Sequence, residues 1–600
     1  MSKIAKQYYI IDFDSTFIKV EALEELAAIS LTEKKEKAVI LEQIRQLTDD
    51  GIDGKISFTD GLRARLELIK AHADHLPKLI KQLKKKISTS ILRNKDFFQE
   101  HAGQIYLVSA GFREFIVPIV KAYGIPADRV FANTFEFDKK GRIIGFDEKN
   151  LLSFPDGKQQ QLKALNLDGE IFVVGDGYSD YLMTEGLAEV KFFAFTENIE
   201  RVSARENADH VTPSFDEFLY HNNLPMAISY PKNRIKVLLL ENVHSNAREL
   251  LLEEGYQVEL LPHSLPEAEL CEAIRDVSII GIRSKTKLTP KVLSHAERLI
   301  AVGAFCIGTN QIDLEACQEK GVAVFNAPFS NTRSVVELVI GEIILLMRGI
   351  PDKNHKMHQG IWDKSATNSN EIRGKTLGII GYGNIGAQLS VLAESMGMKV
   401  LYFDKVDKLF LGNAIRCSSM KELLRKSDVV TLHVDGDPLN RDIFGAAEFK
   451  QMKAGALFLN LSRGFVVDVD ALAEGLKSGR IRGAAVDVYP KEPRSNDEPF
   501  ESELVGLPNL ILTPHIGGST QEAQEDIARY VPEKLINYVN TGNTFASVNF
   551  PNLQLPAQKE AHRLIHIHFN QPGILAKINQ ILSEHGCNIV GQHLKTNESI

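Results

Sequence analysis

Short apolar runs alternate with segments of helical periodicity along most of the chain. Examples are "QYYIID" and "EIFVVGDG" near the N-terminus, "IKVLLLENV" and "VSIIGIRS" in the middle, and "KTLGIIGYG" from 375 onward. Leu, Ile and Val recur every three or four residues between these runs, as in helices that bury one face. The alternation predicts parallel sheets covered by helices, so we expect an α/β protein with several domains.

Breaks in this pattern indicate where the domains divide. Residues about 20–90 are rich in Glu, Lys, Leu and Ile at helical spacing and end in "KQLKKKIST", which predicts a helical insertion. The stretches "HNNLPMAISYPKNRI" (221–235) and "PNLQLPAQKE" (551–560) contain prolines and no period, and we interpret both as linkers. A chain of 600 residues has room for about three to five domains of ordinary size.

Composition narrows the classes of function. The chain has 70 basic and 78 acidic residues, a net charge of −8, which argues against a broad nucleic-acid surface and requires local cations at any anion site. Its five cysteines include no CxxC pair, which is typical of a reducing compartment without disulfides or zinc. The N-terminus lacks a signal-peptide pattern, and the richest apolar stretch carries Glu337 and Glu342. We therefore expect a cytoplasmic protein that binds neither nucleic acid nor a membrane.

A glycine-rich turn in "KTLGIIGYGNIGAQLSVLAESMGMKVLYFDK" has the context of a dinucleotide site. An apolar strand precedes it, a helix follows, and Asp404 closes the next strand. The first glycine permits the tight turn, the second lets the backbone approach pyrophosphate, and the third lets the helix pack on the strand. A carboxylate at Asp404 suits the ribose hydroxyls and repels a 2′-phosphate, so the sequence predicts NAD rather than NADP. The predicted cofactor-binding residues of this turn and strand end are Gly381, Gly383, Asn384, Ile385, Gly386 and Asp404.

Three apolar strands farther on end in polar residues. They are "ALFLNLSRG", with Arg463, "GAAVDVYPKEP", with Asp487 and Glu492, and "LILTPHIGGS", with His515. Carboxyl ends of parallel strands border the ligand crevice. We expect Arg463 to bind a carboxylate and His515 to accept a hydroxyl proton as hydride leaves, with Glu492 raising the pKa of the imidazole. Asp487 is expected beside the cofactor or as a supporting partner.

Residues 236–550 resemble the D-2-hydroxyacid dehydrogenase family, and most closely its members that oxidise D-3-phosphoglycerate. "GIRSKTKLT", "VGAFCIGTNQIDL", "FNAPFSNTRSVVELVIGE" and "LTPHIGGSTQEAQE" carry the resemblance. It implies that Arg463, Glu492 and His515 form the catalytic set. It also implies that Arg283, Ser284 and Asn331 bind substrate, although residues at such strand ends are often only turn formers.

The same resemblance implies a discontinuous domain organisation. The substrate-binding domain would be 234–332 rejoined by 518–550, with the NAD-binding domain between them at 333–517. Helices near 333–347 and 519–540 would act as hinges. Trp362, on a polar stretch before the second sheet, is a candidate for an oligomer contact.

The N-terminal run ends in two carboxylates, Asp12 and Asp14. Such a pair is explained by Asx capping, by a metal site or by acid–base chemistry. Asp176 and Asp180 in "IFVVGDGYSD", together with Ser109 and Lys158, supply suitable groups at other strand ends. Asp12 and Asp176 can share Mg²⁺, with Asp14 in the same metal set, while Asp12 attacks phosphorus and Asp14 transfers protons. Ser109 and Lys158 would hold the phosphoryl oxygens.

This constellation resembles the haloacid dehalogenase superfamily, and "IDFDSTFIKVEALEELA" resembles its members that hydrolyse O-phosphoserine. The resemblance covers residues about 6–220 and implies a Rossmann-like domain at 1–222 whose helical insertion is a cap. Glu21 and Arg65 would then bind the ammonium and carboxylate of the substrate, although charged helix residues often only face solvent. The chain has "SAG" and "GDGYSD" where "SGG" and "GDGAND" are usual.

The last residues, 560–600, read as strand, turn, helix and strand. "HRLIHIHFNQPGILAKINQILSEHGCNIV" resembles the first half of an ACT domain, so we expect a partial ACT-like βαβ fold. The resemblance implies that His568, Asn570 and Asn588 contact an amino-acid effector, serine, between subunits of a homo-oligomer. The alternation in "HIHF" also suits a metal, but no further ligands have metal-site spacing.

Together these observations predict a bifunctional enzyme of serine biosynthesis with small phosphorylated substrates. One activity is NAD-dependent oxidation of D-3-phosphoglycerate, and the other is Mg²⁺-dependent hydrolysis of O-phosphoserine. Two alternatives remain. In one, the N-terminal domain is a non-catalytic regulatory or oligomerisation module; in the other, the dehydrogenase-like part senses NAD without turnover.

Overall fold

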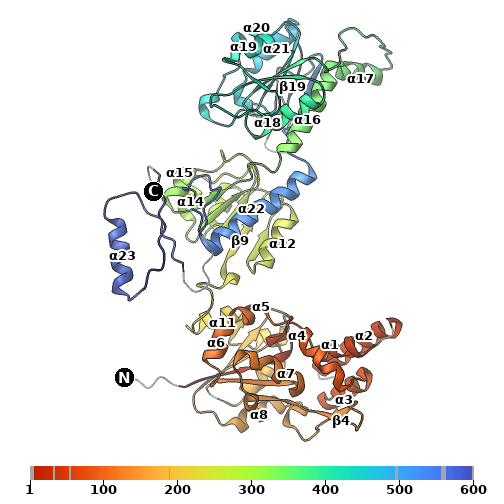
Figure 1. Ribbon diagram of the computed structural model, residues 1–600, viewed down its shortest axis with the longest axis vertical. Coiled ribbons are helices and arrows are strands. Elements are labelled where there is room, and N and C mark those ends of the chain that lie inside the picture. The colour runs from red at the N-terminus through yellow and green to blue at the C-terminus, as the bar shows by residue number, and fades with distance from the viewer. Residues whose placement is uncertain are drawn as a thin grey trace. The chain divides into compact units, whose positions relative to one another are not determined.

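The computed structural model describes residues 6–31, 34–52, 56–187, 189–493, 498–555, 563–597 and 600. The chain folds into two compact units, Met1–Arg234 and Ile235–Ile600. One parallel sheet forms in the first unit and two form in the second, and helices flank each of them (Figure 1). This confirms the predicted α/β multidomain class. Within the described ranges, no helix combines the length and apolar character needed to cross a bilayer.

The main sheet of the N-terminal unit is entirely parallel, with strand order β3-β2-β1-β6-β7-β8. Its strands are β1 (Gln7–Ile11), β2 (Ile105–Phe112), β3 (Val130–Asn133), β6 (Glu170–Gly175), β7 (Val190–Phe195) and β8 (His210–Thr212). The central strand β1 is apolar on both faces, because Tyr9 and Ile11 join one core and Ile10 joins the other. The run is therefore continuous rather than alternating, as expected for a strand buried on both sides.

The helical insertion shares a core with the sheet and extends beyond the segment 20–90. Leu26, Leu62 and Leu79 belong to the same apolar cluster as Tyr9. The helices before β2 are α1 (Ala22–Ser30), α2 (Lys34–Ile52), α3 (Phe58–Ile69), α4 (Leu76–Leu83), α5 (Thr89–Arg93) and α6 (Lys95–Glu100). A later hairpin of β4 (Phe135–Phe137) and β5 (Ile143–Phe146) packs against α3, where the N–H of Ile143 donates to the carbonyl of Ala71 over 3.0 Å. The hairpin thus adds to the insertion.

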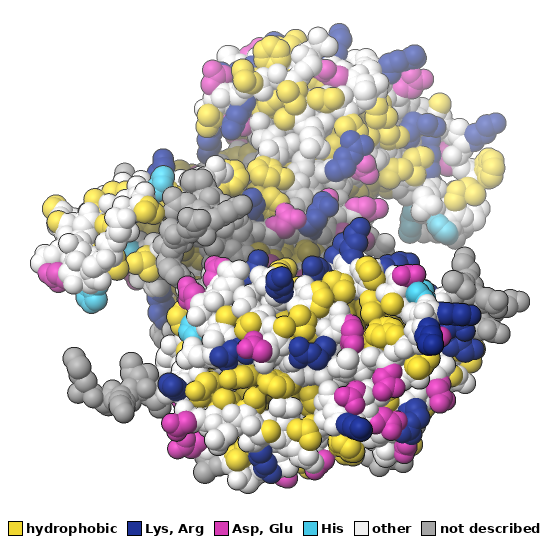
Figure 2. Space-filling view, turned by 60° about the horizontal axis from the view of Figure 1, so that its bottom comes forward, with side chains coloured by type: hydrophobic (Ala, Val, Ile, Leu, Met, Phe, Trp, Pro, Cys, Tyr) yellow, Lys and Arg dark blue, Asp and Glu magenta, His cyan; other side chains and the backbone are white. Residues whose placement is uncertain are grey.

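The remaining helices of this unit cover the sheet. They are α7 (Arg113–Val120), α8 (Gly157–Leu165), α9 (Tyr178–Tyr181), α10 (Val202–Glu206) and α11 (Phe215–His221). Basic and acidic side chains are interspersed over the face of this unit that Figure 2 shows. No broad basic surface is seen on that face, in line with the acidic composition.

The end of the N-terminal unit is held by hydrogen bonds to Glu217 on α11. Glu217, 3% exposed, accepts two hydrogen bonds from Arg234, at 2.9 and 2.7 Å, and one from Asn233, at 3.0 Å. His210 contacts the same carboxylate at 3.0 Å. The guanidinium of Arg234 also lies 4.7 Å from the ring centre of Tyr220. The segment interpreted as a linker is therefore folded onto the unit as far as Arg234.

The first sheet of the second unit is parallel, in the order β10-β9-β11-β12-β13. Its elements are β9 (Lys236–Leu239), α12 (Ser245–Glu253), β10 (Gln257–Leu260), α13 (Glu267–Ala273), β11 (Ile279–Ile282), α14 (Pro290–His295), β12 (Ala301–Ala304), α15 (Leu314–Glu319) and β13 (Ala323–Phe325). The distant helix α22 (Gln521–Thr541) packs on α12 and β12. Asn549 then hydrogen-bonds both Val322 and Val324 at the edge strand β13. The chain after 520 thus returns to this sheet.

The second sheet lies between these two segments in the sequence and has the order β16-β15-β14-β17-β18-β19-β20, all parallel. Its strands are β14 (Thr376–Ile380), β15 (Lys399–Phe403), β16 (Ile415–Arg416), β17 (Val429–Leu432), β18 (Ala456–Asn460), β19 (Ile481–Val486) and β20 (Leu510–Leu512). Its helices are α16 (Thr332–Met347), α17 (Ile350–His358), α18 (Asn384–Ser395), α19 (Met420–Lys426), α20 (Ala446–Gln451) and α21 (Val469–Lys477). The long apolar helix α16 packs on α18 and on β18 to β20, so it belongs to this sheet.

The predicted βαβ fold of residues 560–600 is only partly present. Helix α23 (Ile574–Glu584) forms as predicted, but no strand occurs within the described residues 563–597. The expected strands contain Leu564 and Val590, which are exposed. A strand needs a hydrogen-bonded neighbour and a covered apolar face, and neither is formed here by the described residues.

Candidate active sites

Strand register brings Asp12 and Asp176 together at one edge of the N-terminal sheet. Ile11 of β1 is opposite Val174 of β6, so each aspartate follows directly after its paired strand. The Phe13 N–H donates to Asp12 over 2.7 Å, and the Thr16 hydroxyl donates to Asp176 over 2.9 Å. The turn Phe13–Phe17 that follows β1 therefore holds both carboxylates from one side.

Three buried carboxylates form a group that fits a divalent cation. Asp12, Asp176 and Asp180 each offer an oxygen, and these oxygens all lie within 4.8 Å of one another. Burial, assisted by the neighbouring carboxylates, raises the pKa of Asp176 to about 7 and that of Asp180 to about 6. A Mg²⁺ ion, which binds carboxylate oxygens, would relieve this repulsion. The group includes Asp180 and leaves out Asp14, which the sequence had placed in the metal set.

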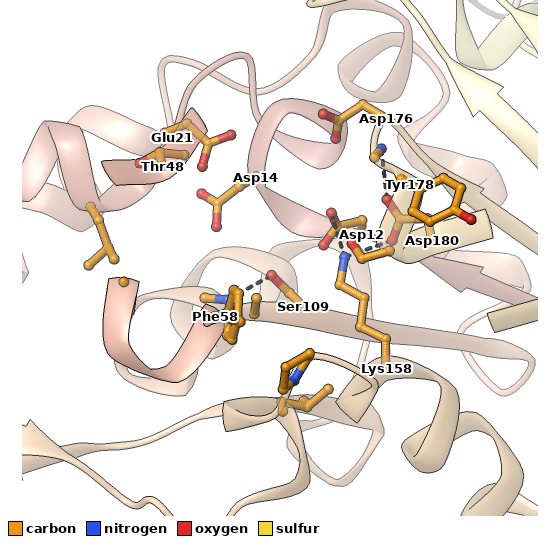
Figure 3. A pocket seen from close by; sticks show the side chains of 18 of the residues that line it. Asp12, Asp14, Glu21, Thr48, Phe58, Ser109, Lys158, Asp176, Tyr178 and Asp180 are labelled. Atoms are coloured by element: carbon orange, nitrogen blue, oxygen red, sulfur yellow. Dashed lines mark hydrogen bonds and ion pairs between the residues drawn. The ribbon is translucent and has the colours of Figure 1, made fainter. Parts of the chain in front are cut away.

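Lys158, the second residue of α8, is the cation beside this group. Its Nζ lies 2.9 Å from Asp12 and 2.7 Å from Asp180 (Figure 3). Burial opposes its charge, but the two aspartates outweigh that effect, so the pKa of Lys158 lies above its ordinary range. Lys158 therefore stays charged at neutral pH, as phosphoryl binding requires.

Asp14 faces the other side of the same cavity, which has a volume of about 490 Å³. Its carboxylate accepts a hydrogen bond of 2.7 Å from the Ala22 N–H instead of joining the metal group. Burial, with a further contribution from the charge of Glu21, raises the pKa of Asp14 well above its ordinary value. Asp14 is thus suited to hold a proton. Ser109 lines the same cavity and accepts from the Gly111 N–H over 3.0 Å.

The predicted amino-acid ligands Glu21 and Arg65 also line this cavity. Glu21 accepts a hydrogen bond of 2.8 Å from the hydroxyl of Ser15. Arg65 donates to the Gly61 carbonyl and the Thr48 hydroxyl at 3.3 and 3.2 Å. Burial lowers its pKa. The cavity therefore has an acidic and a basic residue away from the metal group.

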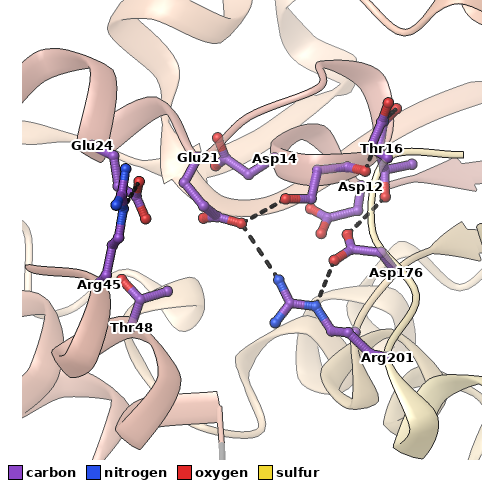
Figure 4. A network of polar contacts seen from close by, with 12 residues as sticks. Asp12, Asp14, Thr16, Glu21, Glu24, Arg45, Thr48, Asp176 and Arg201 are labelled. Atoms are coloured by element: carbon purple, nitrogen blue, oxygen red, sulfur yellow. Dashed lines mark hydrogen bonds and ion pairs between the residues drawn. The ribbon is translucent and has the colours of Figure 1, made fainter. Parts of the chain in front are cut away.

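Arg201 is a site residue that the sequence analysis missed. Its Nε donates to Asp176 over 2.9 Å, and its Nη2 lies 3.6 Å from Glu21, so it bridges the two sides of the cavity (Figure 4). Burial opposes the charge of Arg201, but Asp176 and Glu21 outweigh it, and its pKa lies above the ordinary value. No motif surrounds it in "ENIERVSAR", and only the fold places it here.

The glycine turn of the second unit has the predicted close packing. Gly381 has φ +91°, and a Cβ there would lie 2.4 Å from the His433 carbonyl oxygen. A Cβ at Gly386 would lie 2.3 Å from the Gly381 carbonyl oxygen, whereas one at Gly383 would meet no atom within 4 Å. Asp404 accepts from the Tyr382 N–H over 2.8 Å, which ties the strand end to the turn. Open space beside Gly383, at the N-terminus of α18, fits the pyrophosphate of a dinucleotide; Asn384 and Ile385 are the first residues of that helix.

Arg463, Glu492 and His515 follow the three adjacent strands β18, β19 and β20. The Nδ1 of His515 lies 2.9 and 3.1 Å from the two carboxylate oxygens of Glu492. This hydrogen bond raises the pKa of His515. Burial opposes ionisation of Glu492, but its bond to His515 outweighs that effect and lowers its pKa. The structure thus brings the predicted pair together and leaves the other ring nitrogen of His515 available.

Arg463 reaches from the second sheet toward a loop of the first. A Cβ at Gly308 would lie 3.3 Å from its Nη2. Burial lowers the pKa of Arg463. Burial also raises the pKa of Cys306 to about 11, with smaller influences from Arg283 and Arg463. Two arginines from different sheets therefore lie near Cys306.

Asp487 stabilises the loop that carries His515 through hydrogen bonds. Its Oδ1 accepts from the Thr513 hydroxyl at 2.5 Å and from the Ile516 N–H at 2.8 Å, and its Oδ2 accepts from the Gly517 N–H at 2.8 Å. Both oxygens are thus engaged with the protein, which fits the supporting role better than direct contact with a cofactor.

The predicted substrate residues of the first sheet lie on two loops. Arg283 and Ser284 directly follow β11, and Ser284 is exposed. Asn331 precedes α16, and a Cβ at Gly518 would lie 2.1 Å from its Nδ2. The beginnings of both hinge segments are therefore in contact, and the hydroxyls of Ser334 and Thr520 add a 2.8 Å hydrogen bond.

The predicted effector residues lie at or near the surface of the described residues 563–597. Asn570 and Asn588 are exposed, and His568 is half-buried. Their role at a subunit boundary stays a prediction.

Comparison with known proteins agrees with the two kinds of domain. Residues 340–517 match the family model for the NAD-binding domain of D-isomer specific 2-hydroxyacid dehydrogenases, and residues 10–185 match the model for haloacid dehalogenase-like hydrolases. The chain is 52% identical over 374 residues to D-3-phosphoglycerate dehydrogenase of Haemophilus influenzae, and 52% identical over 372 residues to that of Dictyostelium discoideum. Each alignment covers 62% of this chain and 91% of the relative. A solved structure of D-2-hydroxyisocaproate dehydrogenase has a TM-score of 0.48 and 25% identity, covering 53% of this chain and all of that one.

Proposed function

Because the chain belongs to the D-3-phosphoglycerate dehydrogenase family, we propose that it oxidises D-3-phosphoglycerate to 3-phosphohydroxypyruvate with NAD. The observation that carries this proposal is the His515–Glu492 pair beside Arg463, at the ends of three adjacent strands. The glycine turn lies on β14 of the same sheet, so the carboxyl ends of its strands form one crevice for cofactor and acid.

The side chains divide the chemistry between them. Arg463 binds the substrate carboxylate and orients C2, because a guanidinium matches a carboxylate with two hydrogen bonds. The free ring nitrogen of His515 accepts the hydroxyl proton, and Glu492 stabilises the imidazolium that results. NAD, when bound, accepts the hydride from C2. Arg283 and Ser284 bind the phosphate at the far end of the acid.

A panel of 2-hydroxy acids with and without a phosphate tests this function. We expect NADH formation to be fastest with D-3-phosphoglycerate, and His515→Ala to abolish it while cofactor binding is retained. Preference for an unphosphorylated acid would overturn the assignment of substrate. Cofactor binding by the wild type without turnover of any acid would favour the NAD-sensing alternative.

We also propose that the N-terminal unit hydrolyses O-phosphoserine in a Mg²⁺-dependent reaction. The supporting observation is the buried group of Asp12, Asp176 and Asp180 with Lys158 bound to two of its members. Mg²⁺, held by these carboxylates, would shield charge between Asp12 and the phosphoryl group. An isolated regulatory module would gain nothing from burying so many like charges, which cost stability.

The residues then act in two half-reactions. Asp12 attacks phosphorus and displaces serine, and Asp14, protonated because its pKa is raised, gives its proton to the leaving oxygen. Asp14 next removes a proton from water, which releases phosphate from Asp12. Lys158 and Ser109 bind the phosphoryl oxygens throughout. Glu21 and Arg65 suit the ammonium and carboxylate of the amino acid.

A matched pair of variants tests the phosphatase. We expect Asp12→Asn to lose phosphate release from O-phosphoserine, while Asp128→Asn, an exposed carboxylate of the same unit, keeps it. Dehydrogenase activity should be equal in both. A wild type that binds O-phosphoserine but releases no phosphate would favour the non-catalytic module instead.

A further inference from the structure

Glu241 is a buried acid of the dehydrogenase unit that the catalytic scheme does not use. It follows β9 and is 7% exposed. Its carboxylate accepts three backbone hydrogen bonds from one loop: from Arg283 at 3.2 Å, Lys285 at 2.9 Å and Thr286 at 2.7 Å. An internal anion is therefore surrounded by three N–H donors of the loop that carries the predicted phosphate ligands.

The backbone at Glu241 is held in a conformation that its own side chain disfavours. Its φ is +65°, and that of Asn242 is +52°. A left-handed conformation is unfavourable for a non-glycine residue and persists where surrounding contacts require it. Here the Glu241 N–H donates to His263 over 3.3 Å while its carboxylate turns beneath the loop 283–286. The loop is held from another side by Gln311, whose amide donates to the Arg283 carbonyl over 2.7 Å.

We propose that Glu241 is a positioning residue for the phosphate end of the substrate. This inference rests on the proposed function of the dehydrogenase unit. By occupying the N–H groups of the loop, Glu241 fixes the backbone from which Arg283 and Ser284 extend. It also excludes an arrangement in which those N–H groups bind the phosphate themselves. The N–H groups of Arg283, Lys285 and Thr286 are then unavailable to the phosphate.

The charged side chains on and near the loop 283–286 are consistent with this proposal. Arg283 and Arg463 both lie close enough to Cys306 to influence the pKa of its thiol, so the loop is near Arg463. The Glu241 carboxylate is buried and engaged by three N–H groups of the loop, so it is not presented to solvent. Removing the carboxylate would leave these three donors without their partner, which is unfavourable for any that stays buried.

The experiment compares Glu241→Ala and Glu241→Gln with wild type in the reduction of 3-phosphohydroxypyruvate by NADH. Glu259→Ala is the matched control, because Glu259 is an exposed residue on the neighbouring strand β10. We expect Glu241→Ala to raise KM roughly tenfold or more, with kcat and NADH affinity changed less than roughly threefold. Glu241→Gln should raise KM less, since its amide oxygen still accepts from the loop. Sodium formate should lower the raised KM of Glu241→Ala by replacing the missing carboxylate.

The outcomes separate this inference from the proposed function. An inactive wild type would refute the proposed function. An active wild type with unchanged KM in both Glu241 variants would overturn the inference alone. A fall in kcat with unchanged KM would also overturn it, because it would indicate a purely structural role. If Glu241→Ala does not fold, the KM of Glu241→Gln decides: a rise supports positioning, and wild-type KM overturns it.

Discussion

Because of Glu342, we expect the dehydrogenase unit to become less stable as the pH rises. It lies on α16, is 2% exposed, and neither carboxylate oxygen accepts a hydrogen bond from a described residue. Burial, assisted by the charge of Asp487, raises its pKa from an ordinary 4.5 to about 8. Glu342 is therefore protonated in the folded protein at neutral pH, although it would be ionised in the unfolded chain.

The sign and size of the effect follow from linkage. Between pH 4.5 and 8 the native state binds the extra proton, so the free energy of unfolding falls as pH rises. At about 1.4 kcal/mol per pH unit, the free energy of unfolding is lower than at pH 4.5 by roughly 3 kcal/mol at pH 7 and by roughly 5 kcal/mol at pH 8 and above. Below pH 4.5 the residue is protonated in both states and makes no contribution of this kind.

Replacing Glu342 by Gln removes the ionisation while keeping the shape of the side chain. Calorimetric melting curves of wild type and Glu342→Gln should nearly coincide at pH 5, and the variant should melt several degrees higher at pH 8.5. Added NADH identifies the relevant transition, because it stabilises the unit that binds it. Glu337→Gln is the control, since Glu337 is on the same helix but 60% exposed and paired only with Arg333. A difference between wild type and Glu342→Gln that stays constant from pH 5 to 8.5 would refute the reasoning.

Three further outcomes are expected. Glu492→Gln should lower the pKa of His515, so the alkaline limb of the pH profile for NADH-dependent reduction, which needs the protonated imidazole, should move to lower pH; an unmoved limb would contradict the assigned pairing. Gly111→Ala places a methyl group 2.9 Å from Asp14 and should reduce phosphate release roughly tenfold or more, whereas Gly103→Ala, with no atom within 4 Å, should leave it unchanged. Removal of Mg²⁺ by a chelator should abolish phosphate release and spare NADH-linked turnover; equal loss of both would argue against a metal site confined to the N-terminal unit.

Much of both sites was predictable from sequence because parallel strands end at one edge of their sheet. Asp12 and Asp176 follow β1 and β6, which are neighbours, and Arg463 and His515 belong to the same end of another sheet. The apolar run before each residue identified the strand. The glycine turn could also be predicted from sequence. At Gly381 and Gly386 a side chain would collide with nearby backbone atoms, so the spacing of these glycines reflects the fold.

What escaped prediction depends on side-chain direction and on contacts between distant segments. Asp180 lies in the group of carboxylates that could hold a metal ion, whereas the Asp14 carboxylate accepts a hydrogen bond from the Ala22 N–H. Arg201 reaches Asp176 from a stretch without a motif. Glu241 needs a left-handed backbone that its residue type does not indicate. Sequence pattern locates strand ends but does not say which way each following side chain turns.

The hydrogen bonds to Glu217 determine where the chain can be cut to separate the two units. Arg234 ends the N-terminal unit, and Lys236 already begins β9, so a single residue separates them. If the chain were cut near Asn222, where the sequence looks like a spacer, Glu217 would lose its hydrogen bonds to Asn233 and Arg234. Its buried charge would then be unpaired, which lowers the free energy of unfolding by roughly 3–5 kcal/mol. A gene that encodes the N-terminal unit by itself should therefore extend through the codon for Arg234. The boundary between the two units therefore lies just before the first strand of the second unit, and the stretch that resembles a spacer belongs to the first.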